Sequence, residues 1–356
     1  MRVAAYLVTA GLMLQACGSS DTPDSKTAAE ASAACGGAGA QEFVTGSAET
    51  AADDARTLQE RFRVAGVTGV SVGANGASVC VVAPAGSRDA VAALTQPGEL
   101  AFYDWEPNVI GPDGAPAPDD PDVTGGINAG TAGALSYYDA VLRASTRPVA
   151  AKSASDRGQA YMLDQEHERV LAGPADQFDG PVCEESGSAS RCVATIKSGT
   201  VVVQAAPQPD GEPRTDPSRA KSYVLADRVA LTGEDLTNPE QTFDQAPGAH
   251  GEPIVTFDFT KRGGEAWETL TRAVSRRGAK ALEPGGNPLA AVQHFAVVQD
   301  GRLISVPFID SQMNPDGVDA ADGAQIVAGM AIQSAQALAA TIASGPLSGP
   351  LRPAAD

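Results

Sequence analysis

The sequence predicts an α+β fold made of two subdomains. The first observation is an order of strand, helix, strand, strand, helix and strand between residues 41 and 106. The second is a further set of strands and amphipathic helices between residues 221 and 346. Between these regions the chain is crowded in two places with Pro, Gly and Asp, and such stretches mark exposed connections. We therefore expect two α+β subdomains separated by a long connection.

The first residues, MRVAAYLVTAGLMLQACGSSD, have the features of a signal peptide. One charge at Arg2 precedes an apolar stretch from Val3 to Leu14, which is too short to span a bilayer as a helix. Leu14-Gln15-Ala16-Cys17 resembles the lipobox of bacterial lipoproteins, in which the cysteine becomes the lipidated first residue. We expect removal of residues 1–16 and lipid, palmitate included, on Cys17. An ordinary secretory signal with an incidental cysteine is the alternative.

The charge balance bears on partners and location. The chain has 44 acidic and 25 basic residues and a formal net charge of −19, which opposes an electrostatic hold on nucleic acid or anionic lipid heads. No later segment approaches the ~18 consecutive apolar residues of a membrane span. We therefore expect a lipid-anchored protein on the extracytoplasmic face of the bacterial cell membrane, with no nucleic-acid partner.

Four cysteines follow Cys17, an even number that suits an oxidising compartment. Cys183 and Cys192 bracket a short loop, CEESGSASRC, so we expect them to form a disulfide. That pairing leaves Cys35 to pair with Cys80. Metal ligation is the competing interpretation, but the sequence has no C-x-x-C and its three histidines are scattered. We expect neither a metal nor a cofactor.

Residues 17–40 lack periodicity and are rich in Ser, Ala, Asp and Gly, as in a flexible tether. The subdomain of residues 41–106 follows with a strand in QEFVTG and a helix from Thr50. Thr50 and Asp53 have the spacing of a capping box, and Gly66 is expected to end the helix.

Two strands, GVSVGA and ASVCVVA, come next about an Asn75-Gly76 turn. A short helix from Ser87 to Leu94 and a strand in ELAFYDWE complete the unit. This order is the ferredoxin-like split βαβ pattern.

The connection of residues 107–220 has no predicted architecture. ALSYYDAVLRA suggests a helix, and QAYMLDQ and RCVATIKSGTVVVQAA suggest strands. The Pro-rich stretch APQPDGEPRTDPSR closes this segment.

The second subdomain, residues 221–346, is expected to combine an antiparallel sheet with two helices. SYVLADRVALTGEDL is predicted to form a strand and a polar turn, EPIVTFDFT and AQIVAGM to form a strand each, and GEAWETLTRAVSRR and IQSAQALAATIASG to form a helix each. FAVVQDGRLISVPFIDS is predicted to form a hairpin at Asp300-Gly301, because this pair tolerates the positive φ angles of a primed turn. One face of the hairpin should meet the core and the other solvent. Residues 347–356 form a tail.

The order of four segments in this region carries a resemblance to a known protein family. They are LADRVALTGEDLTNPEQTFDQ, PIVTFDFTKRGGEAWETLT, FAVVQDGRLISVPFI and AGMAIQSAQALAATIASGPLSGPL. Together they resemble the head of the first periplasmic domain of the SecD/SecDF protein-export family, from about Ser222 to Leu351. LQERFRVAGVTGVSVGANGASVCVVAP and GELAFYDWE are similar to the base of the same domain.

The resemblance implies a base, a head, and a role beside export-machinery components or unfolded polypeptide. In the family, the chain completes the base with another strand after the late helix and enters membrane helices whose charged residues are implicated in proton-driven export. This sequence ends at Asp356, so none of those residues can be carried over. A lipid on Cys17 is expected to replace the helical anchor.

Motifs for catalysis are weak. Gly69-Val70-Ser71-Val72-Gly73 has the letters of a nucleophile elbow, but that motif needs a helix after the serine, and a strand is predicted here. Lys197-Ser198-Gly199 and the stretch Ser218 to Lys221 mimic penicillin-binding-protein boxes in reversed order. Aspartates three residues apart, from Asp316 to Asp322, do not fit a calcium loop.

We therefore expect a non-catalytic extracytoplasmic lipoprotein that binds polypeptide or a membrane or export partner in protein translocation. The alternative is a solute-binding or cell-envelope lipoprotein that shares the fold but not the export role. A compact, polar-lined pocket would favour the alternative, and an open groove with free strand edges would favour polypeptide binding.

Overall fold

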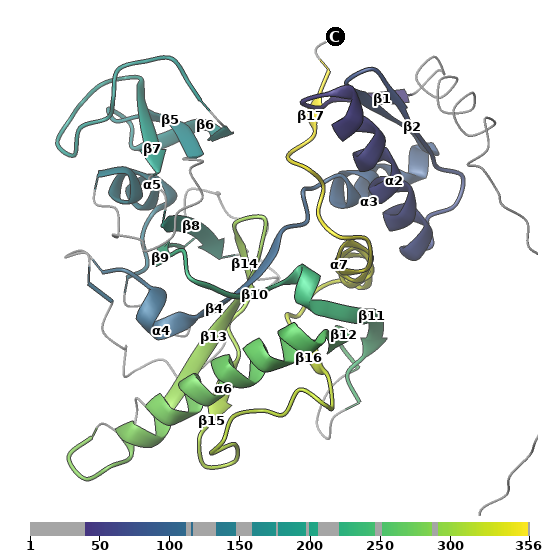
Figure 1. The fold of residues 1–356 in the computed structure, drawn as a ribbon. Helices are drawn as coiled ribbons and strands as arrows, with labels where there is room; N and C mark the ends of the chain where they lie inside the picture. Colours follow the sequence, from purple (N-terminus) through teal and green to yellow (C-terminus); the bar gives the residue numbers. More distant parts are fainter. Residues whose placement is uncertain are drawn as a thin grey trace, which may run out of the picture.

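The structure is a computed structural model, and it describes residues 40–111, 115–116, 133–146, 159–175, 177–196, 199–205, 221–245, 251–286 and 291–354. The described residues form several antiparallel sheets and their covering helices (Figure 1), which confirms the α+β fold class. The predicted signal peptide and nearly all of the tether lie outside these residues.

The N-terminal subdomain, called the base below, has a four-stranded sheet in the order β17-β1-β3-β2. Helix α2 packs on β2 and β3. The bounds of the base elements are β1 Ala40–Val44, α2 Ala48–Val64, β2 Ser71–Asn75, β3 Ser78–Val82, η1 Ala85–Ser87, α3 Arg88–Leu94 and β17 Arg352–Pro353. This strand order is that of the predicted ferredoxin-like fold.

The fourth strand of the base is not the predicted one. ELAFYDWE forms β4 (Leu100–Asp104), but β4 pairs with β13 and β10 in another sheet. The vacant position is taken by β17, at the C-terminal end of the chain, which pairs with β1. A strand pattern predicts a strand but not its partner, and β17 is too short to give a pattern. The carboxylate of Asp54 holds the returning chain by accepting hydrogen bonds from the Ser348 N–H at 2.8 Å and hydroxyl at 2.7 Å.

Two local predictions in the base need correction. Helix α2 begins at Ala48, and its N-cap is Ser47, whose hydroxyl accepts a hydrogen bond from the Thr50 N–H. The turn between β2 and β3 consists of Gly76 and Ala77, because Asn75 still pairs with Ser78 in the ladder. Gly76 has a φ of +57°, which suits the first position of a type II′ turn.

The larger part of the chain, called the head below, is built on a seven-stranded sheet in the order β10-β4-β13-β14-β8-β9, with β15 also paired to β13. Its bounds are β4 Leu100–Asp104, β8 Thr200–Ala205, β9 Ser222–Ala226, β10 Val229–Thr232, β13 Val292–Gln299, β14 Arg302–Ser305 and β15 Phe308–Asp310. Helix α4 (Trp105–Asn108) follows β4 directly. Only Asp227 and Arg228 separate β9 from β10, which are the last and first strands of this sheet.

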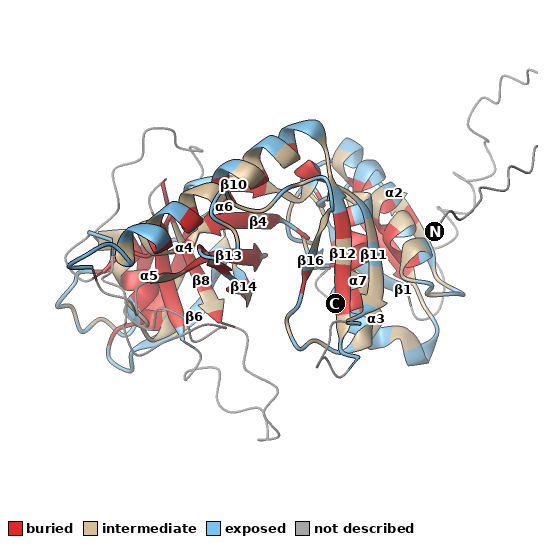
Figure 2. Cartoon of the chain, turned by 90° about the horizontal axis from the view of Figure 1, so that it is seen from below, coloured by how far each residue is buried: buried red, intermediate tan, exposed pale blue. Residues whose placement is uncertain are grey.

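A second layer of the head consists of a three-stranded sheet and two helices. Its elements are η3 Gly233–Asp235, β11 Leu236–Phe243, β12 Pro253–Phe259, α6 Lys261–Ala281, β16 Ala324–Ile326 and α7 Ile332–Ser344. Trp267, Leu270 and Val274 of α6 are buried in one apolar cluster with β4, β12 and β13, as their helical spacing predicts. Figure 2 shows β4 and β13 buried beneath α6.

Helix α7 lies between the base and the head. Leu338 and Ile342 pack into the head cluster, whereas Ala337 and Ala340 pack against the core of the base. The chain thus joins its two subdomains through a helix that is buried on both sides.

The middle region forms a lobe whose apolar core is shared with β8 and β9 of the head sheet. Helix α5 (Tyr137–Thr146) packs against β7, and a three-stranded sheet has the order β6-β5-β7. The strands are β5 Gln159–Asp164, β6 Arg169–Ala175 and β7 Cys192–Ile196. The predicted disulfide between Cys183 and Cys192 is present in the core of this lobe.

The hairpin at Asp300-Gly301 is confirmed, with φ angles of +50° and +72° at the two turn residues. The expectation of a solvent face is wrong. Phe295 and Val297 are buried in one apolar cluster, and Ala296 and Val298 in another. Strand β13 lies in the middle of the sheet between two packed layers, so both of its faces are covered.

Candidate functional site

Several sheet edges in the described residues carry a feature that prevents a further strand from pairing. Prolines lie in the edge strands β6, β11 and β17, at Pro174, Pro239 and Pro353. The outer side of β9 is bridged by Val109 and Leu135. β10, like the end strands β2 and β16, has neither a proline nor a charged residue within its bounds. Because proline and charge are the usual guards of sheet edges, β10 is an unguarded edge.

A groove of about 500 Å³ lies between β10 and helix α6. Its lining combines small apolar side chains with polar ones, namely Asp104, Ala230, Arg262, Glu265, Ala266, Thr269, Leu270 and Ala273. Ala230 comes from the irregular point of the β10 ladder, where the register with β4 shifts. The groove therefore meets the first strand of the sheet at Ala230, and helix α6 supplies most of its lining.

One end of the groove is fixed by Asp235, a buried residue of the turn after β10. Its carboxylate accepts a hydrogen bond from the Thr232 N–H at 2.9 Å and pairs with the Arg262 Nε at 2.8 Å. Gly263 lets α6 come this close, because a Cβ atom there would overlap the Asp235 backbone oxygen. The strand edge and the first turn of α6 are thus tied together by the sequence of the turn.

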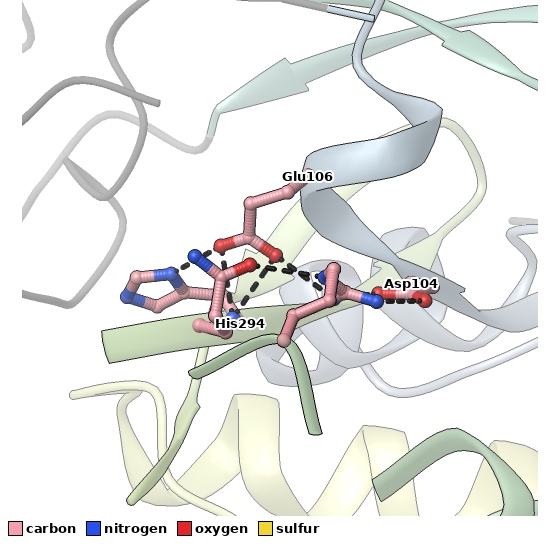
Figure 3. Close-up of polar contacts among 5 residues, drawn as sticks. Asp104, Glu106 and His294 are labelled. Carbon is pink, nitrogen blue, oxygen red and sulfur yellow. Dashed lines mark hydrogen bonds and ion pairs between the residues drawn. The ribbon is translucent and has the colours of Figure 1, made fainter. Parts of the chain in front are cut away.

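Beneath the groove, the Asp104 carboxylate is held by Arg277 of α6. The guanidinium binds both carboxylate oxygens, with a distance of 2.7 Å from Nη1 to Oδ2. The Nε atom of Arg277 donates to Gln293 at 3.0 Å, and Nη2 lies 3.3 Å from the Glu106 carboxylate. Figure 3 shows these contacts, which connect α6 with β4, α4 and β13.

Glu106 continues the polar cluster toward His294. Its Oε1 atom accepts hydrogen bonds from the His294 backbone N–H at 2.9 Å and from the ring Nδ1 at 2.7 Å. Nε2 of this buried ring has no hydrogen-bond partner among the residues described.

The cluster is suited to holding structure in place. Burial raises the pKa of Asp104, and the hydrogen bond from Arg277 opposes that rise. Both carboxylates accept hydrogen bonds from donors of the protein. The cluster fixes the floor of the groove by joining four elements, and the groove itself offers a strand residue, small apolar side chains and charged side chains of both signs.

A second hollow, of about 330 Å³, lies at the base beside β1, α3 and β17. It has no charged residue in its lining, which consists of Gln41, Phe43, Ala92, Thr95, Gln96, Pro97, Pro350, Leu351 and Pro353. The strand at this hollow, β17, contains a proline and is two residues long. The groove at β10 is therefore the better candidate for a functional site.

The site residues predicted from sequence do not gather at the groove. Cys17 and Cys35 lie outside the described residues. Cys80 is buried in β3 and is disulfide-bonded, while its pairing with Cys35 stays a prediction. Cys183 and Cys192 form their disulfide in the lobe of α5 and β7. Within the described residues, no group of three or more His, Cys, Asp or Glu side chains could hold a metal ion.

The sequence patterns did not predict the residues of the groove and of the polar cluster. Asp104 and Arg277 are 173 positions apart in the sequence, and no local pattern joins them. The one available signal was an acidic residue at the end of an apolar strand in AFYDWE.

The fold and the site together define a class of architecture: a ferredoxin-like base that carries an α+β head with a groove at the edge of its sheet. Residues 204–349 match the family model described as SecDF, P1 head subdomain. This part of the chain is thus similar to a SecD/SecDF head subdomain, in agreement with the resemblance of the sequence motifs. No curated protein sequence matches the chain.

Two solved structures are similar to the chain. One is a structure of SecDF, described as a membrane component that enhances protein export, with 16% identity, a TM-score of 0.41, and coverage of 89% of this chain and 98% of that one. The other is a crystal structure of SecDF in a super-membrane-facing form, with 16% identity, a TM-score of 0.43, and coverage of 89% of this chain and 29% of that one. No helix among the described residues is long and apolar enough to cross a membrane.

Proposed function

We propose that this protein is a non-catalytic, extracytoplasmic lipoprotein that holds an extended segment of polypeptide in the groove between β10 and α6 during protein translocation. The observation that carries the proposal is the unguarded edge of β10 beside a groove of about 500 Å³. An extended segment can add to such an edge through its main chain, whatever its sequence, while its side chains occupy the adjoining groove. A binder of many different exported chains needs this kind of recognition.

The composition of the groove supports loose rather than selective binding. Ala230, Ala266 and Ala273 leave room for side chains of different sizes, and Leu270 adds apolar surface at the bottom. The charges of Arg262 and Glu265 are of opposite sign, so the groove favours neither a strongly acidic nor a strongly basic segment. The SecDF-type head over residues 204–349 supports a link to protein export.

The alternative function is that of a solute-binding or cell-envelope lipoprotein with the same fold. Such a protein would bury a small ligand in a compact pocket with converging polar groups. The polar groups nearest the groove are instead engaged with one another, as the bidentate contact between Asp104 and Arg277 illustrates. This observation favours polypeptide binding.

The proposal is tested by filling the groove. Thr269 is exposed and lines the groove, so Thr269→Trp places a large side chain in it. Ala279 is exposed on the same helix and outside the groove, so Ala279→Trp is the matched control. We expect Thr269→Trp to weaken binding of a fluorescent, permanently unfolded polypeptide about tenfold or more, with binding by the control variant unchanged. Equal binding by both variants would exclude the groove, and a small molecule released from the purified native protein would favour the alternative.

Anchorage is a separate part of the proposal. Replacing Cys17 with Ser should abolish labelling of the protein by radioactive palmitate and release it from the membrane fraction or leave the signal uncleaved. The Cys35→Ser variant is the control, because it removes a cysteine outside the lipobox-like segment. If Cys17→Ser takes up as much palmitate as the parent protein, the chain is not anchored through this residue.

A further inference from the structure

The base sheet has two faces, and the helices of the base cover one of them. Val79 and Val81 of β3 pack on this core face with helices α2 and α3. Successive residues of a strand alternate between the faces, so Cys80 belongs to the other face, together with Gly73 and Glu42, which lie opposite it in the ladder. This second face is called the outer face of the base below.

The outer face is covered at its centre. Cys80 has an exposed fraction of 0% and Gly73 is buried, whereas Glu42, Ser71 and Asn75 around them are exposed. Among the described elements, the helix with the main contacts to β2 and β3 is α2, which lies on the core face. The described helices and strands therefore do not account for the burial of Cys80.

Cys80 is also disulfide-bonded. The chain has 5 cysteines, and Cys183 and Cys192 are bonded to each other. Cys17 and Cys35 are therefore the partners that the chain offers to Cys80, and both precede β1 in the sequence. The bond of Cys80 and the cover above it thus indicate the same part of the chain.

We propose that residues 31–39 dock on the outer face of the base and are held there by a disulfide between Cys35 and Cys80. The occupant of this face is thus a segment of the same chain. The inference goes beyond the proposed function, because the groove at β10 takes no part in it.

The sequence of the segment suits a flat sheet face. Residues 31–39 read ASAACGGAG, so no side chain is larger than that of cysteine and none is charged. Small side chains let the main chain come close to the sheet, and Gly73 leaves space beside Cys80 because it has no side chain. Strands β2 and β3 contain no charged residue, as expected beneath a docked segment, where a charge would lose its water.

The path of the chain allows this contact. Ala40 opens β1 and pairs with Val82, and Cys80 lies farther along in the direction in which β1 runs. A disulfide requires Cα atoms within roughly 7 Å of each other, so the chain must reverse its direction between Cys35 and Ala40. Residues 36–39 are Gly-Gly-Ala-Gly, and glycine supplies the backbone freedom that a tight reversal needs.

Docking also shortens the tether. With the lipid anchor proposed for Cys17, residues 18–30 remain as the free tether, and an extended chain of this length spans at most about 45 Å. The anchor then holds the protein by the outer face of its base. This consequence rests on the proposed anchorage, whereas docking itself does not.

Docking is tested by cleaving the purified protein with elastase, a protease that cuts after small residues. Ala28 and Ala29 lie in the free part of the tether and provide an internal reference. We expect cleavage within residues 31–39 to be at least about tenfold slower than cleavage after Ala28 or Ala29, because a docked segment must first open. In Cys35→Ser the two rates should be similar. Equal rates in the parent protein would overturn the proposal.

A matched control removes the other disulfide. Cys183→Ala together with Cys192→Ala should leave cleavage within residues 31–39 slow, because that bridge lies in the lobe of α5 and β7. Cleavage that is accelerated equally in this variant and in Cys35→Ser, or in neither, would exclude a bond of Cys35 as the one that holds the segment.

The bond itself is identified by peptide mapping without reduction. We expect a fragment that joins Cys35 to Cys80. A Cys35 that reacts with a thiol reagent before reduction would overturn the proposal and leave the anchorage untouched. A fragment that joins Cys17 to Cys80 would overturn the proposal and also exclude a lipid on Cys17.

Discussion

The carboxylate of Asp300, at the turn of the head hairpin, accepts a hydrogen bond of 2.8 Å from the backbone N–H of Gly98, in the loop between α3 and β4. The same oxygen accepts a second bond of 2.8 Å from the Glu99 N–H. The backbone N–H of Asp300 in turn donates a hydrogen bond of 3.0 Å to the backbone oxygen of Glu99. The turn therefore attaches the hairpin to the segment through which the chain leaves the base.

This contact leads to a prediction for Gly301. Its φ is +72°, and a Cβ atom would meet nothing closer than the Val202 oxygen at 3.7 Å. Gly301→Val should therefore lower the free energy of unfolding by ~1 kcal/mol or more, through backbone strain and without a steric clash. Urea unfolding measures this change.

The matched control is Gly301→Asn, because asparagine tolerates a positive φ far better than valine. It should lose clearly less stability than the valine variant. Equal losses for the two variants would show that the turn does not require the left-handed conformation.

A second prediction concerns Arg61, a fully buried cation of α2. Its guanidinium donates to the backbone oxygens of Leu94 at 2.9 Å, Pro97 at 2.7 Å and Gly345 at 2.8 Å. Burial lowers its pKa to about 10, so it stays charged at neutral pH. Arg61→Met leaves several buried carbonyl groups without a donor at the C-terminal ends of α3 and α7, and should cost ~3 kcal/mol or more.

Arg61→Lys keeps the charge but cannot reach all of these oxygens. It should destabilise the protein by an intermediate amount in the same unfolding measurement. If Arg61→Met unfolds at the denaturant concentration of the parent protein, Arg61 does not join the base to the end of α7.

The third prediction is a pH dependence of stability. Burial raises the pKa of Asp300, Glu99 and Asp104. A raised folded-state pKa means that the folded protein binds the proton more tightly than the unfolded chain. The stabilising contribution is therefore complete below the ordinary values of 3.8 for Asp and 4.5 for Glu, and it is lost as the pH rises through the raised pKa values.

We expect the free energy of unfolding to increase as the pH falls from 7 toward the ordinary aspartate range. Asp300→Asn should make this increase smaller, because it removes one of the three carboxyl groups. The exposed Glu60 acts in the opposite sense at low pH, since its hydrogen bond to Arg63 lowers its pKa. A slope that is unchanged in Asp300→Asn would mean that this carboxyl group does not contribute.

The fourth prediction concerns the disulfide between Cys183 and Cys192, which are 9 positions apart. Such a bridge stabilises mainly by restricting the unfolded chain, by ~2–3 kcal/mol for a loop of this length. Replacing both cysteines with Ala should lower the melting temperature accordingly. Thermal unfolding that coincides with that of the parent protein would contradict this prediction.

The sequence predicted elements with strong local patterns. Three features depend on a few neighbouring residues only. They are the apolar face of α6, the end of α7 at Gly345 and the turn at Asp300-Gly301. Strand β11 was missed because one of its sides is polar and it contains Pro239.

Long-range pairing could not be predicted. The sequence pattern of β4 would be the same if this strand completed the base or lay in the head. Its pairing with β13 is what places it in the head. The two buried faces of β13 depend on layers formed by distant segments. The groove could not be predicted from the sequence, because it forms only where β10 and α6 lie side by side in the fold.

The most direct test of polypeptide binding is site-specific photocrosslinking in the intact cell envelope. A photoreactive amino acid at Thr269 lies in the groove, and one at Ala279 lies on the same helix outside it. We predict that the probe at Thr269 captures newly exported chains in transit and that the probe at Ala279 captures about tenfold fewer. Capture of exported chains equally from both positions, or from neither, would contradict the proposal that the groove between β10 and α6 holds an extended polypeptide.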